Sequence, residues 1–126
     1  MAGQEPRILV VEDEAIIALE MESLLTQASY DVVACGSLQL GLKAAEGESF
    51  DAAVLDLNLH GEMSFPLADI LTQKNVPFIF VSGYELEIVP RQHRRRPFVG
   101  KPYLSQKVLT ALTNAIAGSR RLATSG

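Results

Sequence analysis

Residues that can take part in chemistry follow four short apolar runs of the sequence. The first run is followed at once by three acids, in the stretch ILVVEDE at residues 8–14. Asp56 follows the run AAVL, Ser82 follows FIFV, and Lys101 stands two residues after FV. Carboxylates, a hydroxyl and an ammonium are therefore placed at or just beyond the ends of apolar segments.

Carboxylates as crowded as those of Glu12, Asp13 and Glu14 raise one another's pKa unless a cation neutralises them. Mg²⁺ fits best, because it takes only one or two carboxylates and keeps water or phosphate oxygens as its other ligands. Such an ion beside a carboxylate, a hydroxyl and a lysine equips a site for phosphoryl transfer. Asp56 would then be the nucleophile and form an acyl phosphate.

The elements that must position these residues follow from hydrophobic periodicity. Short apolar runs alternate with segments of helical spacing, which predicts an α/β fold with a parallel sheet covered on both faces. Because ligands bind at the carboxyl ends of such strands, the polar residues are expected to converge there. The predicted strands are Ile8–Val11, Val32–Cys35, Ala52–Leu55, Phe78–Val81 and Phe98–Val99.

Helices are predicted between and after the strands. Ser37 is expected to cap the second helix, which Gly47 ends; Pro66 opens the third, and Ser105 caps the last. The residues expected on inner faces are Ile17, Met21, Leu24, Leu25 and Ala28, then Leu38, Leu42 and Ala45, then Leu67, Ile70 and Leu71, and last Val108, Leu109, Leu112 and Ile116.

The connection from Ser82 to Lys101 is too short for a full helix with its loops. Pro90 and Pro97 interrupt it, so one or two poor, mobile turns are expected near Glu85–Val89. The connection also holds one dense charge run, whose alternative interpretations are a solvated face and a docking surface for an acidic partner: Arg91, His93, Arg94, Arg95 and Arg96.

Length and composition indicate one globular domain. The chain has 126 residues, 48% of them hydrophobic, and a net charge of −4, so neither disorder nor nucleic-acid binding is predicted. No apolar run is long enough for a signal peptide or a membrane span, so we expect a cytoplasmic protein without membrane partners. The core is expected over residues 7–117, with a flexible tail at 118–126, and Cys35 as a small buried hydrophobe.

Four motifs resemble, in order and spacing, the receiver domain of two-component response regulators. They are VVEDE, VLDLN around Asp56, FVSGY around Ser82 and GKPY around Lys101, and the resemblance covers residues 7–117. It implies a flavodoxin-like (CheY-like) five-stranded parallel sheet of order 2-1-3-4-5. Pro102 stands where the family has a cis peptide bond.

The resemblance also implies roles for the site residues. Asp56 is the expected acceptor of a phosphoryl group from a sensor histidine kinase or a phosphotransfer protein, without turnover of an external substrate. Lys101 is expected to pair with the phosphoryl group, and Ser82 to hydrogen-bond to it. The implied Mg²⁺ ligands, direct or through water, are Glu12, Asp13, Asp56 and the backbone carbonyl of Asn58.

The sequence departs from the common family pattern in three places, one of which is the absence of the alanine-glycine-rich stretch before the fifth strand. Leu59 and His60 replace the usual methionine-proline pair, and Phe98 stands where a tyrosine is frequent, so the usual coupling to a tyrosine hydroxyl is missing. FVSGY and DLNLHGEMSFPLADIL are similar instead to the alphaproteobacterial Phe-Ala-Thr-Gly-Tyr (FATGUY) subgroup. Kinases of the HWE class often serve that subgroup.

Several residues keep two interpretations. Asn58 could orient an attacking water or be a solvent-facing loop amide, and Tyr84 could shield the pocket or pack on the sheet edge. Glu14 is expected in the first turn of a helix, where the macrodipole favours acids. His60, without a second histidine nearby, is expected to be an exposed loop residue and not a metal ligand.

The resulting prediction is a stand-alone receiver that signals through a protein partner at residues 84–103, or serves as a phosphate sink. A receiver-like interaction module that is never phosphorylated is the main alternative. An aspartate-based phosphatase would need a second acid where Asn58 stands. Dinucleotide binding would need a glycine-rich loop where EDEA stands.

Overall fold

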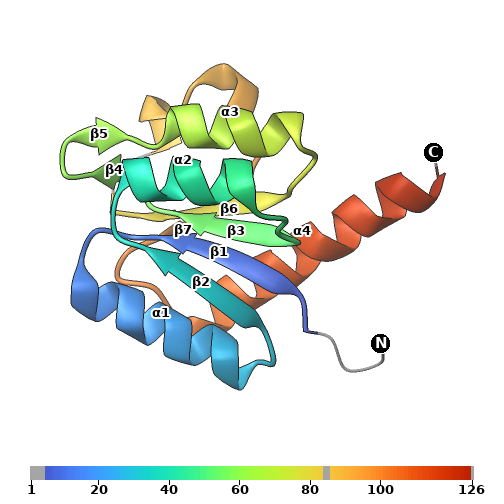
Figure 1. Cartoon of the computed structure of the whole chain (residues 1–126), viewed down its shortest axis with the longest axis horizontal. Helices are drawn as coiled ribbons and strands as arrows, with labels where there is room; N and C mark the ends of the chain where they lie inside the picture. Colours follow the sequence, from blue (N-terminus) through green and yellow to red (C-terminus); the bar gives the residue numbers. More distant parts are fainter. Residues whose placement is uncertain (1–4, 84–85, 126) are drawn as a thin grey trace.

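The computed structural model describes residues 5–83 and 86–125, apart from the side chains of residues 86 and 120–125. Five parallel strands form one sheet in the order β2-β1-β3-β6-β7 (Figure 1). This is the predicted flavodoxin-like order, since β6 and β7 are the fourth and fifth strands of that sheet. The strands are β1 (Arg7–Val11), β2 (Asp31–Cys35), β3 (Ala52–Leu55), β6 (Phe78–Ser82) and β7 (Phe98–Gly100).

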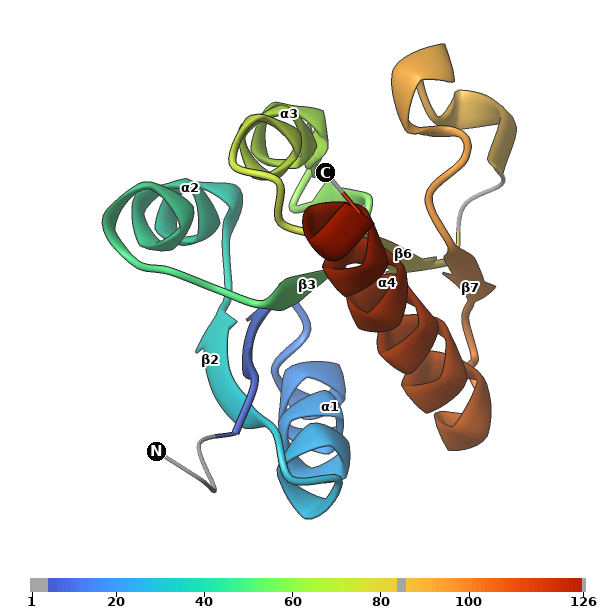
Figure 2. The ribbon, with the colours of Figure 1, turned by 90° about the vertical axis from the view of Figure 1, so that its right-hand side faces the viewer.

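Helices cover both faces of the sheet, as predicted. Side chains alternate along β1, so that Leu9 and Val11 pack beneath α2 and α3 while Ile8 and Val10 pack against α1 and α4 (Figure 2). The sheet is therefore buried between two apolar layers. The helices are α1 (Ala15–Gln27), α2 (Leu38–Gly47), α3 (Phe65–Gln73) and α4 (Ser105–Ser125).

The helix ends agree with the sequence prediction in part. The Ser37 hydroxyl caps α2 by accepting a hydrogen bond from the N–H of Leu40 at 3.2 Å, and α2 ends at Gly47. The predicted cap at Ser105 is wrong, because Ser105 is already the first residue of α4 and the carbonyl of Leu104 accepts the N–H of Lys107. Ala28, predicted on an inner face, is exposed because α1 ends at Gln27.

One prediction about exposure needs correction, and one about the chain end stays a prediction. α4 continues past Gly118 as far as Ser125, while the predicted flexibility of residues 118–126 is a separate property. Cys35 is half-buried and not fully buried, because β2 is an edge strand of the sheet. Burial, together with the charge of Glu48, raises the pKa of the Cys35 thiol.

The connection between β6 and β7 holds two short 3₁₀ turns, η1 (Leu86–Ile88) and η2 (Arg91–His93). The predicted poor turns are confirmed, although Glu85 lies outside the described residues. The interpretation of the charge run as a solvated face is wrong for two of its members. His93 is 2% exposed with its Nε2 2.7 Å from Asp69 Oδ1, and the half-buried Arg96 guanidinium lies over the Phe78 ring.

A small antiparallel hairpin after β3 was not predicted. It pairs β4 (Asn58–Leu59) with β5 (Glu62–Met63) around His60 and Gly61, whose φ angles are 54° and 87°. Such left-handed angles at both central positions are typical of a two-residue hairpin turn. Leu59 is fully buried and anchors the hairpin beside the end of β3.

Candidate functional site

Backbone hydrogen bonds of the sheet hold the site residues at the carboxyl ends of the strands. The Asp56 N–H donates to the carbonyl of Val11 at 3.0 Å, and the Lys101 N–H donates to the carbonyl of Ser82 at 3.0 Å. These bonds continue the parallel ladders by one residue beyond β3 and β7. The peptide bond between Lys101 and Pro102 is cis.

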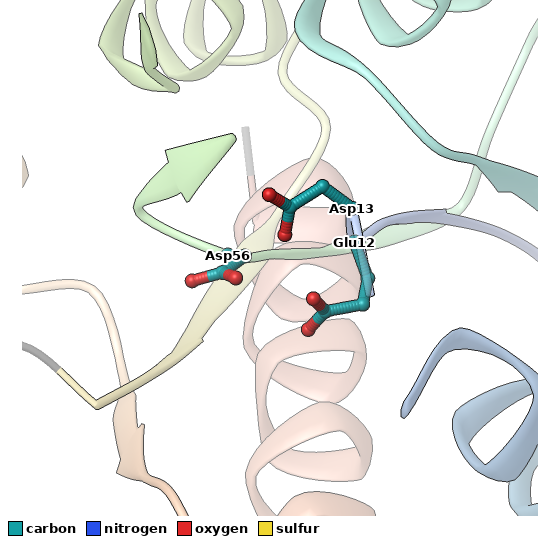
Figure 3. A group of neighbouring side chains, drawn as sticks. All are labelled: Glu12, Asp13 and Asp56. Atoms are coloured by element: carbon teal, nitrogen blue, oxygen red, sulfur yellow. The ribbon is translucent and has the colours of Figure 1, made fainter. Parts of the chain in front are cut away.

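Three carboxylates gather at these strand ends. One oxygen from each of Glu12, Asp13 and Asp56 lies within 4.8 Å of the others, so that the side chains of the β1 loop reach toward Asp56 (Figure 3). Glu12 and Asp56 are 6% and 7% exposed. The convergence predicted from the sequence is therefore present, in a nearly buried setting where uncompensated charge is costly.

The Lys101 ammonium lies between two of the carboxylates. Its Nζ donates to Glu12 Oε1 at 2.6 Å and to Asp56 Oδ2 at 3.1 Å. Each of these distances is short enough for a charge-assisted hydrogen bond. In the described part of the chain, one lysine thus serves two nearly buried acids.

Burial and neighbouring groups shift the pKa values of both Glu12 and Lys101. Burial raises the pKa of Glu12, and the charge of Asp56 adds to this, against the opposing hydrogen bonds from Lys101 and the Glu14 N–H. For Lys101, burial alone would lower the pKa, but the hydrogen bonds and charges of Glu12 and Asp56 outweigh it and raise the pKa. At Glu12, burial together with the charge of Asp56 therefore outweighs the contacts that would lower the carboxyl pKa.

The β4–β5 hairpin fixes the third carboxylate. The backbone N–H of His60 donates to Asp13 Oδ2 at 2.9 Å, and His60 Nδ1 lies 3.3 Å from the same oxygen. The turn is closed by Asn58, whose Oδ1 accepts the N–H of Gly61 at 2.6 Å. The His60 side chain is 72% exposed, which agrees with the predicted loop position, but its contact with Asp13 was not predicted.

A cleft of about 330 Å³ opens over the site. Asp13, Asp56 and Lys101 line it together with Ser82 and Asn58, whereas Glu12 contributes from beneath through Lys101. The predicted site residues are thus brought together. Tyr84, whose role was left open, lies outside the described residues.

His60 also lines the cleft, and the sequence contained a signal for its position. A residue followed by glycine between two short segments is typical of a two-residue hairpin turn. Two-residue strands carry no periodic pattern, however, so the hairpin could not be recognised from hydrophobic spacing.

Residues 8–113 match the family described as the response regulator receiver domain. The chain belongs to this family. Receiver domains act in two-component signalling, and they typically interact with sensor histidine kinases.

Relatives of this receiver agree with the assignment. The transcriptional regulatory protein TdiR of Thauera aromatica is 29% identical, over 96% of this chain and 56% of the relative. The solution structure of SdrG from Sphingomonas melonis Fr1 is 34% identical, has a TM-score of 0.78, and is matched over 93% of this chain and 99% of that one. This receiver spans between 18% and 56% of the length of the curated relatives it matches.

One structure similar in fold holds a metal ion. It is the receiver domain of the sensor histidine kinase PA1611 from Pseudomonas aeruginosa PAO1, with magnesium coordinated in its active-site cleft. Its identity to this receiver is 19%, with a TM-score of 0.76 over 90% of this chain and 99% of that one.

Among the described helices of our receiver, none combines the length and apolar character needed to cross a membrane.

Proposed function

We propose that this receiver is a phosphorylatable switch in which Asp56 accepts a phosphoryl group from a phosphohistidine. The observation that carries the proposal is the placement of Asp56. Its carboxylate is nearly buried at the floor of an open cleft, 3.1 Å from Lys101 Nζ and beside two further acids. A nucleophile in this position is reached only from the cleft, by a donor that presents a phosphoryl group.

Asp56, Lys101 and Ser82 each have a separate role in the phosphoryl transfer. A carboxylate oxygen of Asp56 forms a bond to phosphorus while the phosphorus–nitrogen bond of the phosphohistidine breaks, and the freed imidazole nitrogen retains the electron pair. Lys101 neutralises a phosphoryl oxygen by moving its ammonium from the carboxylate to the new anion. The Ser82 hydroxyl, at the end of β6, hydrogen-bonds to the same group.

The acids fit a divalent cation. Three carboxylates with oxygens inside 4.8 Å exceed the charge of one lysine, and oxygen donors are those that Mg²⁺ prefers. Glu12, Asp13, Asp56 and the backbone carbonyl of Asn58 would hold it, directly or through water. When bound, Mg²⁺ supplies neutralisation of the phosphoryl oxygens and carboxylates.

The finer placement within the family is also a proposal. We assign the chain to the FATGUY subgroup on the stretches FVSGY and DLNLHGEMSFPLADIL. Phe98 packs against the core layer under α2 and α3 and has no hydroxyl. Phosphorylation would then change how residues 84–103 bind a protein partner, or the receiver would serve as a phosphate sink. Either role would be carried out in the cytoplasm. An HWE-class kinase is the matching expectation.

The test is phosphoryl uptake from acetyl phosphate, followed by intact mass with and without Mg²⁺. One added phosphoryl group is expected on the wild type, and none on Asp56→Asn or after removal of the metal. Asp51→Asn is the matched control, because Asp51 stands just before β3 while Asp56 stands just after it. It should keep full uptake.

The opposite result would favour the interaction-module interpretation. Because some receivers accept only from their kinase, beryllofluoride is added and amide NMR shifts are followed around the cleft. If neither reagent changed the protein, Asp56 would not be a phosphoacceptor, and the proposal would be withdrawn.

A further inference from the structure

A groove of about 680 Å³ lies at the end of the sheet opposite Asp56. It is bounded by the loop from α3 to β6, by residues 95–97, and by the second half of α4; Figure 2 faces this side of the molecule. Pro77 and Pro97 line it just before β6 and β7 begin. Asp56 and Ser82, in contrast, stand where their strands end.

The groove is basic although the chain as a whole is acidic. Arg95 and Arg96 line it, and none of its described lining residues is an Asp or Glu, in a chain whose net charge is −4. The remaining lining includes apolar groups from two sides, such as Val76 and Ala115. An occupant must therefore offer both negative charge and apolar surface.

Arg96 is only partly compensated. Its guanidinium lies 4.3 Å from the centroid of the Phe78 ring, and its Nη2 donates to Thr72 Oγ1 at 3.0 Å. None of the ion pairs in the described ranges involves Arg95 or Arg96. Burial lowers the pKa of Arg96, because the charged guanidinium is less well solvated here than in water. In the described ranges, Thr72 is the hydrogen-bonding partner of the Arg96 side chain, which carries five N–H donors.

Arg7 provides an internal contrast at the same end of the sheet. Its guanidinium also lies over a phenylalanine ring, 5.2 Å from the centroid of Phe50. Unlike Arg96, it pairs with carboxylates, at 2.6 Å from Glu48 and 3.5 Å from Asp31. The fold therefore supplies acids to one stacked arginine and leaves the other without them.

We propose that this groove binds an acidic segment of a partner protein, with a carboxylate on Arg95 and Arg96 and an apolar side chain between the α3–β6 loop and α4. Charge complementarity selects this occupant. Nucleic acid is disfavoured because two arginines offer few phosphate contacts and Phe78 is fully buried, so no aromatic face is open for base stacking.

The placement of the groove gives the partner a distinct relation to phosphorylation. Because the groove and Asp56 lie at opposite ends of the sheet, a phosphoryl donor and the acidic partner can be bound at the same time. The docking surface goes beyond the proposed switch and does not depend on Asp56 chemistry.

The test uses a fluorescein-labelled peptide of sequence Glu-Glu-Leu-Phe-Glu-Glu, with a Gln-Gln-Leu-Phe-Gln-Gln peptide as its neutral control. Binding is followed by fluorescence anisotropy and by amide NMR shifts. The acidic peptide is expected to bind and to shift residues 72–78, 95–97 and 114–119, while the neutral peptide binds about tenfold more weakly.

Four variants decide the result. Arg95→Met and Arg96→Met should each weaken binding about tenfold, whereas Arg91→Met, an exposed arginine of the same run outside the groove, should not. Arg95 is exposed, so its replacement leaves the fold intact even where Arg96→Met perturbs it. Asp56→Asn should bind normally, which separates this proposal from the switch.

Absence of binding, equal binding of the two peptides, or equal losses for Arg91→Met and Arg95→Met would overturn the proposal. A single-stranded oligonucleotide that bound through Arg95 and Arg96 in place of the acidic peptide would also overturn it, in favour of a nucleic-acid site.

Discussion

Two sites at opposite ends of the central sheet carry unbalanced charge of opposite sign. At the carboxyl end, Glu12 and Asp56 share the Lys101 ammonium beside a third acid, Asp13, whereas at the amino end Arg95 and Arg96 line a groove with no acid among its described residues. Each imbalance is held in partly buried surroundings, where it costs more than it would in water. One end of a single sheet can therefore carry a site suited to a cation, while the other end carries a site suited to a carboxylate.

Arg7 shows what a compensated charge looks like in the same molecule. Its neighbours Glu48 and Asp31 pair with the guanidinium, and Asp51 accepts its backbone N–H at 2.7 Å. Ion pairs of this exposed kind tie β1 to the strands beside it with a modest gain in stability. Neither the carboxylate cluster around Asp56 nor the groove at Arg95 and Arg96 is fully neutralised in this way by described residues of the chain.

The largest expected effect comes from removing charge at the carboxyl end. Asp13→Asn should weaken Mg²⁺ binding about 10- to 100-fold, which is about 1.4 to 2.7 kcal/mol, because the site loses one of three clustered carboxylates. Isothermal titration with MgCl₂ measures it without any phosphoryl donor. The Asn side chain can still accept the N–H of His60, so the hairpin is retained.

The control for this prediction is a neighbouring acid in the same loop. Glu14 is exposed and is absent from the carboxylate cluster, so Glu14→Gln should leave Mg²⁺ affinity within about twofold of the wild type. Equal losses in the two variants would mean that general negative potential, and not a built site, attracts the ion.

The strand ends could be predicted because the signal for them is local. A buried parallel strand is a continuous apolar run, and the residue after it lies at the ligand-binding edge, which located Asp56, Ser82 and Lys101 without any knowledge of tertiary contacts. The order of the strands came from the resemblance, since periodicity alone does not specify which strands are neighbours.

The features that were missed depend on contacts between distant segments. His93 and Arg96 were grouped with a solvated charge run, yet they are placed by Asp69 and Phe78, which are remote in sequence. Charge is a local signal that tertiary packing can override.

The pH dependence of stability measures the carboxyl-end imbalance directly. Burial raises the pKa of Glu12 above its ordinary value of 4.5, so the folded protein keeps a proton that the unfolded chain has lost. The free energy of unfolding of the metal-free protein should therefore fall as pH rises from 4.5 through the folded pKa. Urea denaturation in EDTA at a series of pH values tests this.

Glu12→Gln isolates the contribution of that group, since an amide cannot lose the proton. Its stability should lack this fall with pH, while Glu14→Gln should keep it. Added Mg²⁺ should also reduce the fall in the wild type, because the ion neutralises the ionised cluster. A rise of stability with pH over the same window, abolished by Glu12→Gln, would mean that Lys101 compensates Glu12 fully.

The smallest expected effect distinguishes the two stacked arginines at the amino end. Arg7→Met should lower the free energy of unfolding by about 1 kcal/mol at low salt, from its exposed ion pairs and its contact with Phe50. Arg96→Met should cost about 0.5 kcal/mol, from the contact with Phe78 and the exposed hydrogen bond to Thr72, without the loss of an ion pair in the described ranges. Urea denaturation at low salt and at about 1 M NaCl separates the two cases.

Salt is the deciding variable because screening acts on charge pairs and not on ring contacts. The loss caused by Arg7→Met should shrink near 1 M NaCl, since the carboxylates of Glu48 and Asp31 are then screened from the guanidinium. The loss caused by Arg96→Met should stay the same or grow, because salt relieves the repulsion between Arg95 and Arg96. If it shrank as the Arg7 loss does, Arg96 would have an acidic partner within the chain, and the amino end of the sheet would hold no unbalanced charge for a partner's carboxylate to meet.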